Sequence, residues 1–170
     1  MSSDNLTTLS PFNTPLEIGL RTLCLLTEAY PLPQSLNRLV VFDYLTIHSD
    51  DMPSGPAGLH PKTPYRSGEL LVRRESLQKG LLLYHSRGLI ARRYTAEGVF
   101  YSATESSASF LDSLQTEYTQ LLRNRASWVV SEFNTYTDAE LSSLVRDHIG
   151  VWGAEFEMES VLWAEGREPQ

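Results

Sequence analysis

The chain has 170 residues and a mass of 19.2 kDa, a size that predicts one domain or one domain with a helical extension. It is 41% hydrophobic and 21% charged, which excludes an intrinsically disordered acidic polypeptide. The formal charge of −7 at pH 7 argues against a protein coated throughout for nucleic acid, and a single cysteine, Cys24, excludes an internal disulfide framework and a cysteine-rich zinc ribbon.

The N-terminal third of the chain predicts an arm and two helices. Residues 1–13 are predicted to form a flexible arm. A helix is predicted to begin at Thr14, because threonine is a good N-cap, Pro15 suits the first helical position and Glu17 is placed to close a capping box. A second helix is predicted over residues 35–48, where a run of four apolar residues indicates neighbours on more than one side.

The middle of the chain predicts a loop, a third helix and a hairpin. The loop, over residues 49–64, is rich in proline and glycine. The third helix is predicted to begin at Ser67 and to end before Gly88, because glycine suits the position after a helix end. Strands over residues 89–94 and 99–102 then form a β-hairpin. Three helices followed by a hairpin is the order of a winged helix-turn-helix domain.

The remaining residues predict a helical extension. A single long amphipathic helix is predicted over residues 106–133, about 42 Å at 1.5 Å per residue. A second capping box, at Thr137, predicts one more helix. The fold class that follows is mainly α (α+β), with a winged helix-turn-helix core, a small β-hairpin wing and a C-terminal helical extension. The core is expected over residues 14–104, and the extension with its tail over residues 105–170.

Positive charge is concentrated in one stretch of this acidic chain. Residues 60–93 hold eight lysines and arginines against two carboxylates, whereas residues 132–170 have a net charge of −7. The planar guanidinium of arginine suits the recognition of phosphate or carboxylate. The sequence therefore predicts a basic patch that contacts a partner or nucleic acid, made of Arg66, Arg73, Arg74, Arg87, Arg92 and Arg93. The alternative is a solvated face that the acidic C-terminal segment neutralises.

Sequence motifs for catalysis or cofactor binding are missing. The chain has no phosphate-binding glycine loop, GxSxG elbow, HExxH or CxxC, and its four histidines lack the spacing of metal ligands. We therefore expect no catalytic residue, cofactor, metal or small-molecule substrate. No apolar run approaches the ~18 residues of a membrane span, and the polar N-terminal sequence lacks the layout of a signal peptide. We expect a cytoplasmic protein with no membrane partner.

A long motif in the basic stretch, together with shorter ones, resembles a known family. The residues that carry the resemblance are Leu59-His60-Pro61, Pro64 to Arg74 (PYRSGELLVRR), Gly80-Leu81, Ser86 to Leu89, Phe110 to Leu114, Tyr118, Arg125 to Val129 and Trp152 to Phe156. They resemble the middle component of ABC-three-component systems. The resemblance implies a small non-catalytic subunit of a bacterial anti-phage defence complex. Such a subunit would be an adaptor between an SMC-like ABC ATPase and an effector subunit, often a nuclease, as in Lamassu-type systems.

An adaptor needs side chains that bind other proteins, and interface energy concentrates in large aromatic residues. The sequence predicts partner anchors at Trp128, Trp152, Phe156 and Trp163, with packing inside the subunit as the alternative. A second function also stays open, that of a winged-helix DNA-binding transcriptional regulator. In that case the third helix would enter the major groove, with Arg92 and Arg93 on phosphates. The two functions combine if the adaptor contacts the DNA backbone within the complex.

Overall fold

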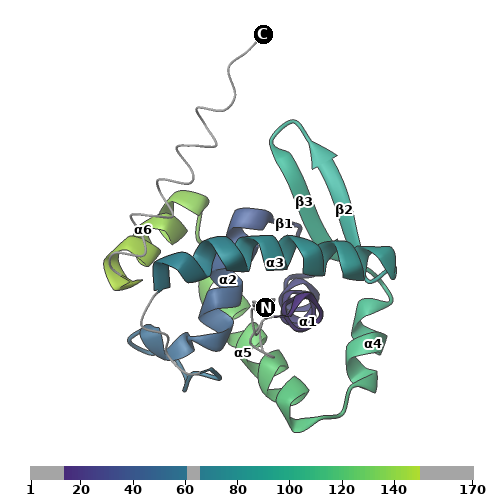
Figure 1. Ribbon diagram of the computed structural model, residues 1–170, viewed down its shortest axis with the longest axis horizontal. Coiled ribbons are helices and arrows are strands. Elements are labelled where there is room, and N and C mark those ends of the chain that lie inside the picture. The colour runs from purple at the N-terminus through teal and green to yellow at the C-terminus, as the bar shows by residue number, and fades with distance from the viewer. Residues whose placement is uncertain (1–13, 61–65, 150–170) are drawn as a thin grey trace, which may run out of the picture.

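The computed structural model describes residues 14–60 and 66–149, which fold into helices and one small antiparallel sheet. In chain order the elements are α1 (Pro15–Ala29), β1 (Gln34–Ser35), α2 (Leu36–Ile47), the 3-10 turn η1 (Ser49–Asp51), α3 (Arg66–Ser86), β2 (Ile90–Thr95), β3 (Gly98–Ala103), α4 (Ser107–Ser113), α5 (Glu117–Phe133) and α6 (Asp138–Ile149). The fold is mainly α with a small β-hairpin, as the sequence predicts. Figure 1 shows the hairpin and α6 near opposite ends of α3.

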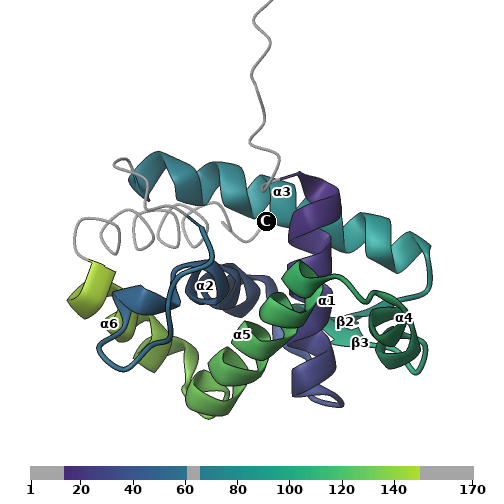
Figure 2. The same cartoon turned by 90° about the horizontal axis from the view of Figure 1, so that it is seen from below.

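Helix α1 lies at the centre of the molecule. It packs against α3 on one side and against α5 on another, as Figure 2 also shows. The closest approach of α1 to α3 is at Gly19 and Gly80. A Cβ atom on Gly80 would lie 2.8 Å from the backbone nitrogen of Gly19, and a Cβ atom on Gly19 would lie 2.5 Å from the Tyr84 ring. The two helices can meet at this distance because neither glycine carries a side chain.

The helix starts predicted at Thr14 and Thr137 are confirmed, with one difference in hydrogen bonding, whereas α3 begins at Arg66, before the predicted Ser67. The backbone N–H of Glu17 donates to the Thr14 hydroxyl over 3.3 Å, as an N-cap requires. The carboxylate of Glu17 does not close a capping box, because it accepts a hydrogen bond from the Tyr118 hydroxyl at 2.7 Å. At the start of α6 both bonds of the box form, between Thr137 and Glu140.

The sheet has three antiparallel strands in the order β1-β3-β2. The hairpin strands pair from Ile90 opposite Ala103 to Thr95 opposite Gly98, close to the predicted bounds. Strand β1 pairs with β3 through Gln34 opposite Tyr101. This strand was not predicted, because two residues are too short to show an alternating pattern. The winged helix-turn-helix domain itself stays a prediction, with which this strand order is compatible.

The prediction of one long helix over residues 106–133 is wrong. The chain forms α4 and α5, separated by an extended segment that ends at Thr116. The Thr116 hydroxyl accepts a hydrogen bond from the backbone N–H of Thr119 at 3.2 Å and so caps α5. A threonine side chain that bonds to the backbone three residues ahead stabilises a helix start and competes with continuation of the preceding helix.

The described helices and the hairpin share one hydrophobic core. Its fully buried side chains include Ile18, Leu23, Leu26, Leu39, Phe42, Leu45, Leu77, Leu81, Leu111, Leu122, Val129 and Val145. Residues from both the predicted core (14–104) and the predicted extension (105–170) therefore lie in the same cluster. Within residues 14–60 and 66–149, no helix combines the length and the apolar character needed to cross a bilayer.

Candidate interaction surface

A buried cluster of charges fixes α3 against α1 and α2. Asp43 on α2 is fully buried and accepts hydrogen bonds from Arg21 on α1, at 2.7 Å from Nε and 3.0 Å from Nη2. Its second oxygen also accepts from Nη1 of Arg73 on α3 at 2.6 Å. Two guanidiniums from different helices thus share one carboxylate, and Glu17 adds a second negative charge 3.7 Å from Arg21.

The protonation of Asp43 follows from these contacts. Burial by itself would raise the pKa of the carboxyl, but the charges of Arg21 and Arg73 and their hydrogen bonds outweigh it and hold the pKa below its usual range. Asp43 is therefore ionised at neutral pH. An ionised carboxylate is the partner that two buried guanidiniums require, because an unpaired buried charge is strongly destabilising.

The cluster continues as a chain of hydrogen bonds to the loop that precedes α3. The Tyr118 hydroxyl donates to Glu17 and lies 2.8 Å from Nε2 of His60. Because the single hydroxyl proton of Tyr118 goes to Glu17, Nε2 of His60 must be the donor to the Tyr118 oxygen. Burial, together with the positive charge of Arg21, lowers the pKa of His60 to about 4, so this histidine is neutral at pH 7.

The exposed side chains of the hairpin, which lie on both of its faces, differ from this interior. We define the hairpin surface as Arg92, Arg93 and Tyr94, consecutive exposed residues of the edge strand β2. Tyr94 is 69% exposed, the largest fraction among the large hydrophobic side chains that the structure describes, and the Arg92 guanidinium lies 5.2 Å from the centre of its ring. A shallow hollow of about 460 Å³ adjoins Arg93 and is lined by Pro33, Arg93, Thr95, Ala96, Glu97 and Phe100. Such a surface can bind carboxylate or phosphate groups.

The structure divides the predicted basic patch. Arg73 was expected on the surface; this is wrong, because it is 3% exposed and paired with Asp43. Arg74 is half-buried and donates to the side chain of Asn37 at 2.6 Å. Arg87 is exposed at the C-terminal end of α3, and Arg92 and Arg93 are exposed on the hairpin surface. Helix α3 begins at Arg66, whose side chain lies outside the described part of the structure.

Of the predicted aromatic anchors, Trp128 is the one the structure describes. It is half-buried on α5, packs on the hydrophobic core and makes an edge-to-face contact with Phe133, with ring centres 5.6 Å apart. Its ring therefore serves packing inside the subunit at least in part. Trp152, Phe156 and Trp163 lie outside the described residues.

The sequence analysis did not predict two residues of the buried cluster, Arg21 and Asp43. Arg21 lies within the apolar segment of α1, and Asp43 lies within the most apolar part of α2. Charged residues embedded in two buried helices are a signal for an ion pair, since a buried charge requires a partner. Within the described ranges, no group of three or more His, Cys, Asp and Glu residues could hold a metal ion.

A comparison with protein families shows where this chain belongs. The family described as ABC-three component (ABC-3C) system Middle Component 2 matches residues 11–155, which is most of the chain. No curated protein and no solved structure shows significant similarity to it. The match includes α1 to α6 and therefore the buried cluster, the hairpin surface and the interior contacts of Trp128.

Proposed function

Because the chain belongs to the Middle Component 2 family of ABC-three component systems, we propose that it is the adaptor between an SMC-like ABC ATPase and a nuclease-type effector. Family membership makes it an accessory component of a defence system that has further components as partners. The proposal adds the identity of the two partners, a non-catalytic role and a cytoplasmic location. The observation that carries it is the family match over residues 11–155.

The hairpin surface supports a role in binding. Arg92 and the ring of Tyr94 are exposed side by side on one face of an edge strand, and Arg93 is exposed on its other face. Arginine and tyrosine are enriched among residues that dominate interface energies. The buried cluster supports a rigid base for it, because Arg73 fixes α3 to α2 and α3 leads directly into β2. We assign the hairpin surface to contact with one partner, with additional contact to a DNA backbone held in the complex.

The two α3 arginines whose side chains the structure describes do not support the alternative of a DNA-binding regulator. A recognition helix needs side chains that reach base edges from the major groove. Arg73 is instead paired with Asp43 inside the molecule, and Arg74 is engaged with Asn37. The exposed part of α3 carries Glu75 and Lys79, which form an ion pair with each other at 3.2 Å. These contacts favour a structural role for α3 inside the molecule over the role of a DNA recognition helix.

Co-purification tests the adaptor proposal. The ATPase component carries the affinity tag and is co-expressed with the effector, with or without this chain. We expect the effector to be retained on the tagged ATPase only when this chain is present. The double variant R92E/R93E should lose at least one partner while keeping the thermal transition of the wild type, because both side chains are exposed. The matched control is K79E on α3, whose side chain is 62% exposed.

Three outcomes would overturn the proposal. Retention of the effector on the ATPase without this chain would remove the need for an adaptor. Failure of this chain to bind either component would do the same. Binding of the isolated chain to one defined duplex sequence at ~150 mM salt, with random duplex rejected, would support a regulator instead, since backbone contacts alone give no sequence preference.

A further inference from the structure

The outer edge of the hairpin is open for pairing. In the sheet order β1-β3-β2, strand β2 pairs with β3 on one side, and no other described strand lies on its other side. Figure 1 shows the hairpin extending away from the helices, and residues 91–95 are exposed. An edge strand of this kind is a template for a further strand, because part of its backbone N–H and C=O groups face outward.

The register of the hairpin shows which backbone groups face outward. Thr95 and Gly98 flank a two-residue loop and therefore form a hydrogen-bonded pair. Hydrogen-bonded and non-bonded pairs alternate along antiparallel strands. Ile90, Arg92 and Tyr94 therefore direct their N–H and C=O groups away from β3.

Helix α3 covers one end of this edge. The carbonyl oxygen of Ile90 lies 2.8 Å from Nδ1 of His85, which must be the donor because a carbonyl carries no proton. Arg92 and Tyr94 lie farther along the strand, and no other described residue bonds to their outward N–H and C=O groups. A strand that pairs with β2 would therefore bond to these two residues.

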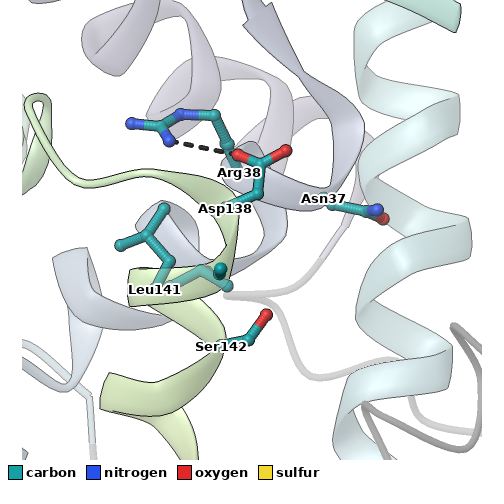
Figure 3. Close-up of a pocket in the computed structure, with 7 residues that line it drawn as sticks. Asn37, Arg38, Asp138, Leu141 and Ser142 are labelled. Atoms are coloured by element: carbon teal, nitrogen blue, oxygen red, sulfur yellow. Dashed lines mark hydrogen bonds and ion pairs between the residues drawn. The ribbon is translucent and has the colours of Figure 1, made fainter. Parts of the chain in front are cut away.

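The arginines of the hairpin surface are not used for ion pairs inside the fold. In the groove between α2 and α6, by contrast, Arg38 is directed at Asp138 with an N–O distance of 3.1 Å, as Figure 3 shows. No carboxylate of the described residues forms an ion pair with Arg92 or Arg93, and Glu97, the one carboxylate of the hairpin, lies in the turn. Because the two guanidiniums lie on opposite faces of β2, a complementary strand has one carboxylate on each face.

A second copy of β2 fits this edge poorly. Two copies paired antiparallel about their centres would place Arg92 of each copy opposite Arg93 of the other. Like charges directly opposite each other destabilise a sheet. A strand with carboxylates at two adjacent positions removes this repulsion and gives each arginine a partner. The same two arginines therefore disfavour self-association and favour an acidic strand.

We propose that the hairpin surface binds a partner protein by strand addition, with an extended acidic segment of the partner pairing with β2 as a fourth strand. The backbone of this segment bonds to Arg92 and Tyr94, and its two adjacent carboxylates bind Arg92 and Arg93. A protein strand suits this edge better than nucleic acid, because a phosphodiester has no donor for the outward carbonyl groups. This inference rests on the proposed function for the existence of a partner and adds the chemistry that recognises it.

A synthetic peptide tests strand addition on the full chain without the partner components. The probe is a capped peptide of about eight residues, valine and threonine with two adjacent glutamates at its centre. Two further versions have N-methyl groups on one or the other set of alternate amides. We expect the unmethylated peptide to bind and one methylated version to bind about tenfold more weakly than the other, because one set of amides faces β2. Equal affinities of the two versions, or no binding of the unmethylated peptide, would overturn the proposal.

Hydrogen exchange resolved by residue locates the new bonds. The peptide should slow exchange of the amides of Arg92 and Tyr94 and leave that of Arg93 unchanged, because Arg93 already bonds to β3. Protection of all three amides alike, or of none, would contradict pairing at this edge.

The variants Y94P and Y94T separate the backbone contact from the side chain. Both remove the ring, but only Y94P removes the outward N–H, at a position where an edge strand tolerates proline. We expect Y94P to bind the peptide about tenfold more weakly than Y94T. Equal affinities would overturn the proposal, and if Y94P unfolds the hairpin, the methylated peptides still decide.

The co-purification experiment separates a failure of this inference from a failure of the proposed function. Y94P should lose the same partner as R92E/R93E, and Y94T should retain it. Retention by both Tyr94 variants would overturn strand addition and leave the adaptor intact. A wild-type chain that binds the peptide as expected but joins no complex would overturn the adaptor alone. Binding of random duplex DNA at the hairpin, equal in Y94P and Y94T and without binding of the peptide, would assign the surface to nucleic acid and overturn strand addition.

Discussion

Gly19 and Gly80 meet at the crossing of α1 and α3, where a Cβ atom on Gly80 would lie 2.8 Å from both the Gly19 nitrogen and the Pro15 carbonyl oxygen. Neither contact can be relieved by rotating a side chain, since both atoms belong to the backbone of α1. The crossing places Tyr84 so that its hydroxyl donates to the carbonyl of Leu16 at 3.0 Å. The position of α3, and with it the position of the hairpin, depends on this contact.

Substituting Gly80 by alanine should therefore destabilise the fold. Alanine is favoured over glycine in a helix by about 1 kcal/mol, so a change without steric conflict would be stabilising. We expect instead a net loss of about 1–3 kcal/mol, because the new methyl group must push the two helices apart. Urea unfolding measures it, with K79A, at the exposed neighbouring position, as the control. A more stable G80A variant would contradict the close helix contact.

Replacing Asp43 by asparagine should be the most destabilising of the polar changes considered. It leaves the buried guanidiniums of Arg21 and Arg73 without their shared carboxylate, for which a loss of about 3–5 kcal/mol is typical. The control is D112N, whose carboxylate is 67% exposed and pairs with Arg123, for which a loss below about 1 kcal/mol is expected. Denaturant unfolding at pH 7 measures both. Similar losses for the two variants would contradict the proposed weight of the buried cluster.

The ionised carboxylate of Asp43 should also make the stability of the fold depend on pH in acid. The pKa of Asp43 is lower in the folded chain than its ordinary value of 3.8, so the unfolded chain binds this proton first as the pH falls. The stabilisation is complete above the unfolded pKa and is lost as the pH falls through the folded pKa. The difference in stability between wild type and D43N should therefore shrink below about pH 4. A difference that stays constant in acid would contradict an ionised Asp43.

His60 should make the stability of the fold depend on pH in a separate, less acidic range. Its pKa is about 4 in the folded chain against 6.5 for an ordinary histidine, so protonation favours the unfolded chain. The stabilisation from neutral His60 is complete above about pH 6.5 and is lost as the pH falls toward 4. Melting temperatures of H60Q should fall less steeply than those of the wild type over this window. Parallel pH profiles would show that His60 does not lose its proton on folding.

Arg38 should stabilise the position of α6 more than that of the other helices. Its guanidinium donates to the carbonyl oxygens of Tyr136 and Asn134 and to Asp138, and it lies 5.2 Å from the centre of the Phe42 ring. Lysine cannot make these planar contacts together, so R38K should destabilise by about 1–2 kcal/mol. Hydrogen exchange should accelerate in α6 more than in α1.

The control for this prediction is R123K, at a position where the guanidinium makes an exposed pair with Asp112. It should leave the exchange of α6 unchanged. If R38K accelerates exchange equally throughout the fold, Arg38 stabilises the domain as a whole rather than α6.

Local signals explain why part of this fold could be predicted. The caps at Thr14 and Thr137, and the glycine at position 88 with its φ of +75°, act within a few residues and are visible in the sequence. The break before α5 was visible too, at Thr116, but the apolar periodicity on both sides of it favoured one continuous helix. Periodicity marks the buried face of a segment and does not exclude a short interruption.

Contacts between distant segments could not be predicted in the same way. Arg73 lies in the most basic stretch of the chain, so its charge indicated a surface residue. Its partner, Asp43, lies 30 residues earlier, and nothing in the sequence shows that the two helices cross there. The exposed residues Arg92 and Arg93 could be predicted, because they lie in an edge strand whose side chains have few neighbours. The exposure of Arg92 and Arg93 depends on local structure, which the sequence shows. The burial of Arg73 depends on tertiary contacts, which it does not show.

Helix α3 also sets the distance between the region of α6 and the hairpin. It has 21 residues, about 31 Å in length, and it joins the region of α6 to the base of the hairpin, as Figure 1 shows. Arg73 and Gly80 hold its middle part against α2 and α1, which makes it a stiff spacer rather than a hinge. Two proteins bound at the hairpin and at α6 would therefore be held at a fixed separation by this helix.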